Sequence, residues 1–162
     1  MTQSPTNARG TISRRSLLIG GLALVGALAG GAWWRRQAPD YDGLALSVSQ
    51  AHAQAARGEI ILIDIRTPRE WRATGLGEHA RPVDMRREDF VQALQKVVGG
   101  DTAAPIALIC ARGVRSARLS LRLTEVGFTN IIDVPEGMLG SGAGPGWLRA
   151  GLPLRDWNED QS

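Results

Sequence analysis

Pro105-Ile-Ala-Leu-Ile-Cys110, followed directly by Ala111-Arg112-Gly113-Val114-Arg115-Ser116, is the most informative stretch of this 162-residue chain. The run up to the cysteine is apolar and of strand length, which is typical of a strand buried on both faces of a parallel sheet. The residues from Arg115 to Val126 predict a helix that Gly127 ends. The stretch therefore predicts a strand, a short glycine-containing loop and a helix, with Cys110 where the strand ends.

Cys110 is the only cysteine in the chain, which excludes an intramolecular disulfide framework. The N–H groups at the start of the following helix carry partial positive charge and cradle anions. Arg112 and Arg115 add full positive charges, which favour a thiolate and attract anionic substrates. A small buried core residue is the alternative, but a core cysteine has no need of two arginines in its loop. The pattern favours a nucleophilic sulfur.

The rest of the chain predicts alternating helices and strands. Helices are expected over Ser49–Arg57, Pro68–Ala73, Glu88–Val98 and Arg115–Val126, and strands over Ile60–Asp64, Arg81–Met85, Pro105–Cys110 and Asn130–Val134. A glycine-rich loop is expected from Gly137 to Gly146. This alternation indicates an α/β domain with a mostly parallel sheet, whose functional loops lie at the carboxyl ends of the strands.

Charge is distributed unevenly along the chain. The first 39 residues hold five arginines and no acidic residue, so the remaining 14 basic residues face 16 acidic ones. The region from residue 40 to 162 is therefore not a basic nucleic-acid binder. His52 and His79, with a single cysteine, form no zinc-ligand pattern, so we expect no metal.

The first 39 residues predict a targeting segment with a linker. Arg14-Arg15 precedes an apolar run that extends to Ala32, which is typical of a twin-arginine (Tat) signal, although Leu17 departs from the usual phenylalanine. Ala27-Leu28-Ala29 fits a signal peptidase site. Residues 16–34 are also long enough for a membrane anchor, and Trp33-Trp34 suits an interface. We expect a periplasmic or otherwise extracytoplasmic location, with the choice between Tat and Sec export, and between cleaved signal and retained anchor, left open.

The region from residue 40 to 162 resembles a single-domain rhodanese, a sulfurtransferase. The resemblance rests on Asp64-Ile65-Arg66 with Glu70-Trp71, on the loop from Cys110 to Arg115, and on the Ile131–Val134 strand with the later Gly137 and Trp147. It implies a rhodanese-like three-layer domain with a central, mostly parallel sheet of about five strands flanked by helices.

Two segments depart from the family pattern. The family's Gly-His-Ile-Pro-Gly-Ala stands here as Gly75-Leu-Gly-Glu-His-Ala80. The family's paired glycine is Glu136-Gly137, and it is followed by an added glycine-rich stretch over residues 140–146. Both segments flank the cleft in the family, so the substrate is left open.

The resemblance implies that Cys110 carries sulfane sulfur as a persulfide, without another cofactor. The sulfur would come from a small anionic donor such as thiosulfate and pass to cyanide, a thiol or a protein thiol. Arg112 and Arg115 would bind the donor, and the N–H groups of the loop would stabilise negative charge on the sulfur. Those N–H groups belong to residues 111 to 116, that is Ala111, Gly113, Val114 and Ser116 together with the two arginines, and Gly113 would also provide backbone angles that larger residues avoid.

Asp64, Arg66 and Glu70 are expected to form a structural hydrogen-bond and ion-pair network that holds the first loop. His52 and His79 are expected on the surface.

Two other functions are considered. One is a non-enzymatic persulfide carrier or interaction module, in which an exposed cysteine outside the cytoplasm would risk mixed disulfides. The other is a cysteine-loop phosphatase or arsenate reductase. In those enzymes five residues separate the cysteine from the arginine, whereas four separate Cys110 from Arg115 here. The shorter loop favours a sulfur atom over a tetrahedral oxyanion.

Overall fold

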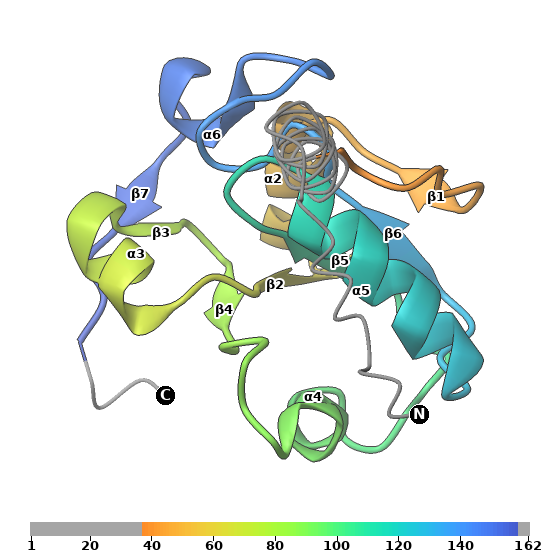
Figure 1. The fold of residues 1–162 in the computed structure, drawn as a ribbon. Helices are drawn as coiled ribbons and strands as arrows, with labels where there is room; N and C mark the ends of the chain where they lie inside the picture. The colour runs from red at the N-terminus through yellow and green to blue at the C-terminus, as the bar shows by residue number, and fades with distance from the viewer. Residues whose placement is uncertain (1–36, 159–162) are drawn as a thin grey trace, which may run out of the picture. The chain divides into compact units, whose positions relative to one another are not determined.

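The computed structural model describes residues 37–158 of the chain (Figure 1). Its elements are β1 (Leu44–Ala45), α2 (Val48–Ala56), β2 (Ile61–Asp64), α3 (Pro68–Thr74), β3 (Leu76–Gly77), β4 (Arg81–Pro82), α4 (Phe90–Val97), β5 (Ile106–Ile109), α5 (Val114–Glu125), β6 (Ile131–Asp133), α6 (Gly146–Arg149) and β7 (Leu154–Arg155). Within this range, no helix has both the length and the apolar character needed to cross a membrane. The expected signal or anchor over residues 16–34 lies outside it.

The central sheet has five strands in the order β1-β6-β5-β2-β4, and every neighbouring pair is parallel. The expected α/β architecture with a five-stranded parallel sheet flanked by helices is therefore confirmed. A separate two-stranded sheet pairs β3 with β7 antiparallel. It lies with α3 beside the β4 edge of the central sheet (Figure 1).

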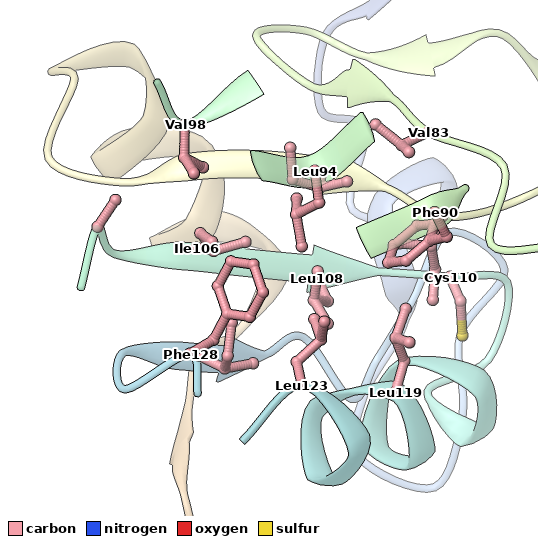
Figure 2. Packing of buried hydrophobic residues seen from close by; sticks show 14 residues of the cluster. Val83, Phe90, Leu94, Val98, Ile106, Leu108, Cys110, Leu119, Leu123 and Phe128 are labelled. Carbon is pink, nitrogen blue, oxygen red and sulfur yellow. The ribbon is translucent and has the colours of Figure 1, made fainter. Parts of the chain in front are cut away.

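Alternating side chains of β5 divide the core into two layers. Ile106 and Leu108 point into a cluster that contains Phe90 and Leu94 of α4 and also Leu119 and Leu123 of α5 (Figure 2). The intervening β5 residues, Ala107 and Ile109, enter a second cluster with residues of α2 and α6. Both faces of the strand are buried, as its continuous apolar run predicts.

Local signals explain where two helices begin. Ser47 caps α2, because its hydroxyl accepts a hydrogen bond from the Gln50 N–H at 3.2 Å while the Gln50 side chain accepts one from the Ser47 N–H at 2.9 Å. Pro68 starts α3, where its missing N–H is not needed. The predicted helices lie within one or two residues of their observed bounds.

The weaker elements differ from the prediction. The strand expected over residues 81–85 pairs only at Arg81–Pro82, and β1, β3 and β7 were not predicted. These strands contain two residues each, which is too short for an alternating pattern to be recognised.

A buried ion pair holds the segment that follows β2. The Arg66 guanidinium donates to Asp64 Oδ2 at 2.7 Å, to Thr74 Oγ1 at 2.7 Å and to the Gly75 carbonyl at 2.7 Å. Asp64 and Arg66 are 0% and 1% exposed. One arginine therefore ties the carboxyl end of β2 to the end of α3.

We expect Asp64→Leu to lower the free energy of unfolding by about 3–5 kcal/mol, because it leaves the Arg66 charge buried without a counterion. The double variant Asp64→Leu/Arg66→Met should be more stable than Asp64→Leu, since no charge remains buried. Chemical denaturation would measure both. Glu59→Leu is the matched control, because Glu59 pairs with Arg57 on the surface, and it should have a much smaller effect. A double variant no more stable than the single one would contradict this explanation.

Candidate functional site

Cys110 follows directly after the last residue of β5, at the carboxyl end of the central strand. Its side chain is 1% exposed and belongs to the cluster that contains Phe90 and Leu119 (Figure 2). The placement at a strand end is as predicted, and the thiol is buried, unlike the exposed cysteine considered for the carrier function. The sulfur is buried because the Cys110 side chain lies on the same face of the sheet as Leu108. Helices α4 and α5 cover that face.

The loop after Cys110 turns sharply into α5 at Gly113. Gly113 has φ +81°, as expected of a glycine placed for its backbone freedom. A Cβ atom at this position would lie 2.2 Å from the Pro135 carbonyl oxygen. The Gly113 carbonyl accepts hydrogen bonds from the Ser116 hydroxyl at 3.0 Å and from the Ala117 N–H at 3.0 Å. The Ser116 side chain is thus used inside the first turn of α5.

The segment after β6 packs against the cysteine loop. The Met138 N–H donates to the Cys110 carbonyl at 2.8 Å, and the Leu139 N–H donates to the Ala111 carbonyl at 2.9 Å. A Cβ atom on Gly137 would lie 2.7 Å from backbone atoms of Ala111 and Arg112. Residues 137–139 therefore fix the shape of the loop, so the glycine that starts this segment has a direct structural role.

Glu136 anchors the same segment from the other side. It is 6% exposed, and its carboxylate accepts hydrogen bonds from the Val48 N–H and from the Gly146 N–H, both at 3.1 Å. The glutamate that replaces a glycine of the family pattern thus ties the start of α2 to the start of α6.

Arg115 is held by Glu70 in a two-point ion pair. Its guanidinium donates to Glu70 Oε2 at 3.0 Å and to Glu70 Oε1 at 2.5 Å. The same carboxylate accepts a hydrogen bond from the Thr67 N–H at 3.0 Å, which closes the capping box of α3. Partial burial alone would raise the pKa of Glu70, but the hydrogen bonds from Arg115 and Thr67 outweigh it and lower the pKa to about 2.

The Glu70 carboxylate therefore pairs with Arg115 and not with Arg66, and Glu70 is connected to the Asp64–Arg66 network only by its carbonyl, through the Thr74 hydroxyl. Asp64 and Arg66 stabilise the segment after β2, whereas Glu70 links α3 to the first turn of α5. The sequence could not show this, because Glu70 and Arg115 are 45 positions apart.

The two loop arginines are in different environments. The pKa of Arg115 is raised, mainly by its hydrogen bonds to Glu70 and in smaller part by interaction with the Cys110 side chain. Arg112 is exposed, and it makes no hydrogen bond or ion pair with the described residues 37–158. Glu70 thus holds Arg115 in the first turn of α5, whereas Arg112 is exposed at the surface.

Asp133 ends β6 close to the start of α5. It is 4% exposed, and its Oδ1 atom has no hydrogen-bond partner among the described residues. Burial raises the pKa of Asp133 to about 6, although contacts with Ser116 and the Val134 N–H oppose the rise. The carboxyl is therefore a buried titratable group at the end of β6, near Ser116 in the first turn of α5, and the sequence alone did not indicate it.

Two surface hollows, with volumes of ≈ 700 Å³ and ≈ 610 Å³, are lined by other residues than those of the Cys110–Arg115 loop. The larger one lies against β4 and α4, and the smaller one lies against β1 and the end of α5. Neither of these two hollows is therefore lined by Cys110, whose side chain is buried.

Comparisons with known proteins agree with this geometry. The family described as "Rhodanese-like domain" matches residues 47–140. The polysulfide-sulfur transferase homodimer from Wolinella succinogenes is 28% identical, covers 75% of this chain and 84% of that one, and superposes with a TM-score of 0.56. A thiosulfate sulfurtransferase from Pseudomonas aeruginosa shares the fold at 20% identity and a TM-score of 0.56, over 72% of this chain and 21% of that one. An uncharacterized protein of Rickettsia rickettsii is 26% identical over 98 residues, which are 57% of this chain and 80% of the relative.

We expect Gly137→Ala to destabilise the protein more than Gly58→Ala. The two glycines have similar φ angles, +66° and +72°, but a Cβ atom at Gly58 meets no atom within 4 Å. Backbone strain should lower the free energy of unfolding by about 1–2 kcal/mol in both variants. The clash with the cysteine loop should add about 1–3 kcal/mol in Gly137→Ala alone and should speed alkylation of Cys110. Equal stability and equal alkylation rates in the two variants would contradict this view of the loop.

We expect Asp133 to make folding less favourable as the pH rises from about 4 to above 6. A carboxyl whose pKa is higher in the folded than in the unfolded protein stabilises the fold below the unfolded value and loses that contribution as pH rises through the folded value. A rise from 3.8 to about 6 corresponds to on the order of 3 kcal/mol. The unfolding free energy of wild type minus that of Asp133→Asn should therefore fall as the pH rises from about 4 to above 6. Asp156→Asn, at an exposed position, is the control, and a difference for Asp133→Asn that stays constant with pH would refute the assignment.

Proposed function

The chain belongs to the rhodanese-like domain family, and from this premise we propose that it is a sulfurtransferase that carries sulfane sulfur as a persulfide on Cys110. The observation that carries the proposal is the position of Cys110, at the carboxyl end of β5 and directly before the loop that starts α5, with Arg115 in the first turn of that helix. Helix N-termini and arginines are the surroundings that stabilise a thiolate and attract anions.

The proposed reaction has two displacement steps. In the first, the Cys110 thiolate attacks the terminal sulfane sulfur of the donor. A sulfur–sulfur bond forms to the cysteine, the sulfur–sulfur bond of the donor breaks, and the electron pair leaves with the donor, as sulfite if the donor is thiosulfate. In the second, a nucleophilic acceptor attacks the outer sulfur of the persulfide, and the thiolate is regenerated.

Each loop residue has a proposed role in these steps. The backbone N–H groups from Ala111 to Ser116 stabilise negative charge on the outer sulfur. Arg112, which is exposed, meets the anionic donor at the surface. Arg115 supplies a fixed positive charge beside Cys110, and Glu70 keeps its side chain in place.

The donor and the location of the protein are further parts of the proposal. The similar protein from Wolinella succinogenes is a polysulfide-sulfur transferase, which supports polysulfide as a donor alongside thiosulfate. A thiol, a protein thiol or cyanide would be the acceptor. The twin arginine and apolar run near the N-terminus support activity outside the cytoplasm, where such sulfur anions would be met.

Intact mass spectrometry of the full chain tests this proposal. After incubation with thiosulfate or polysulfide, wild type should gain one sulfur atom, and cyanide should then remove it as thiocyanate. Cys110→Ser should gain none, because it lacks the nucleophile. If no sulfur is added from either donor, the assignment as a sulfurtransferase is refuted.

Arginine variants test the proposed role of charge in the same experiment. Arg112→Ala should raise the donor concentration needed for half-maximal loading about tenfold, as expected from loss of one charge-assisted hydrogen bond. Arg122→Ala is the matched control, because Arg122 is exposed at the far end of the same helix. An equal effect of the two variants would exclude a specific role for Arg112.

The same samples separate the alternative functions. If a protein thiol removes the sulfur readily while cyanide turnover is poor, the protein is a persulfide carrier. If instead an aryl phosphate is hydrolysed and Cys110→Ser abolishes that hydrolysis, the protein is a cysteine-loop phosphatase.

A further inference from the structure

Two histidines and a glutamate that are distant in sequence meet between α2 and the turn after β3. His52 lies on α2, and Glu78 and His79 lie in the turn between β3 and β4. One potential ligand atom from each of the three residues lies within 4.8 Å of the other two. The two imidazole rings are stacked, with centroids 5.8 Å apart. The sequence-based view that the two histidines form no cluster is therefore wrong.

The backbone presents these side chains in a defined way. The Glu78 N–H donates to the Pro153 carbonyl at 3.0 Å, and the Ala80 N–H donates to the Gly77 carbonyl at 3.0 Å, so the turn is held on both sides of His79. His79 has φ +65°, the one positive φ outside glycine in the described residues. Such a conformation is unfavourable for a residue with a side chain, and it places the imidazole toward His52.

His52 is fixed by packing and has an unsatisfied nitrogen. Its ring is half-buried and packs against the Trp147 ring in a T-shaped arrangement, with centroids 5.5 Å apart. Its Nδ1 atom is buried and has no hydrogen-bond partner among the described residues. A buried polar atom without a partner is uncommon, and it indicates that the ring has coordinating capacity that the protein itself does not use.

We propose that His52, Glu78 and His79 bind a divalent transition-metal ion, with Zn²⁺ as the preferred ion. Two imidazoles and one carboxylate are a ligand set that suits zinc better than magnesium or calcium, which prefer oxygen ligands only. Ligand atoms around a tetrahedral zinc ion lie roughly 3.3 Å apart, given metal–ligand distances of about 2.0–2.1 Å. The three ligand atoms now lie within 4.8 Å of one another. Rotation of the exposed His79 side chain and the half-buried Glu78 side chain would bring them to the shorter separation that zinc requires.

A site with three protein ligands leaves one coordination position for water or for an exogenous ligand. It is also separate from the cysteine loop. His52 contacts Trp147 in the core layer that Ala107 and Ile109 of β5 enter, whereas Cys110 belongs to the opposite layer with α4 and α5. The ion would join α2 to the β3–β4 turn, so binding should stabilise the fold without blocking Cys110.

Zinc titration of the full chain tests the site. We would use untagged protein in the Cys110→Ser background, so that neither a histidine tag nor the thiol competes, at a pH above the usual imidazole pKa of about 6.5. Isothermal titration calorimetry with Zn²⁺ alone should show one equivalent bound, and Zn²⁺ should raise the melting temperature. Co²⁺ in place of Zn²⁺ should give the visible absorption bands of a low-symmetry nitrogen–oxygen site.

Three variants and a control determine whether these residues are the ligands. His79→Asn keeps a residue type that tolerates positive φ, so it should fold normally while zinc affinity falls at least tenfold. His52→Ala and Glu78→Gln should weaken binding at least tenfold as well. Glu88→Gln, at an exposed glutamate outside the cluster, should bind like the parent. Binding of less than one equivalent, or wild-type affinity in His79→Asn or Glu78→Gln, would overturn the proposal even if His52→Ala fails to fold.

Discussion

Burial of β5 on both faces is the constraint on which the rest of the structure depends. A parallel strand in the middle of a sheet has backbone partners on both sides, here β2 and β6, and it needs helices on both faces. Side chains alternate between the two faces along β5 and the residue after it. Leu108 and Cys110 therefore lie in the layer of α4 and α5, and Ile109 lies in the layer of α2 and α6. Cys110 is thus the last residue of one buried row, and the chain must turn immediately after it to start α5. The position of the sulfur follows from how the core is packed.

The cysteine loop is then shaped by segments that are far away in the sequence. Residues 137–139 pack on it from one direction, with hydrogen bonds to the carbonyls of Cys110 and Ala111. Glu70 holds Arg115 from another direction, and because Glu70 also caps α3, the charge beside the sulfur depends on the start of that helix. A loop constrained in this way is preorganised, which matters because fixed donors and charges stabilise a developing anion without having to reorganise.

Polar groups buried near the carboxyl ends of the strands have separate tasks. Asp64 and Arg66 neutralise one another and hold the segment after β2. Glu136 satisfies two backbone N–H groups at the starts of α2 and α6. Burial raises the pKa of Asp133 to about 6, because the hydrogen bonds that oppose the rise are too weak to offset it, whereas hydrogen bonds from Arg115 and Thr67 outweigh partial burial at Glu70 and lower its pKa to about 2. The pKa values of these two carboxyl groups thus differ because burial and hydrogen-bond donors balance differently around each.

The sequence by itself determined the order of the major helices and strands, the parallel sheet and the place of Cys110 at the end of a strand, because these depend on local apolar runs and on glycine, proline and capping residues. It also indicated that Gly113 takes a backbone angle that larger residues avoid. Only the tertiary structure decided that the Glu70 carboxylate pairs with Arg115 and not with Arg66. It also decided that Cys110 is buried and that His52 lies beside Glu78 and His79. Two-residue strands such as β3 carry no periodic signal, yet β3 leads into the turn that brings Glu78 and His79 to α2. Contacts of this kind join residues tens of positions apart, and their partners are set by how elements pack on the sheet, which no local pattern encodes.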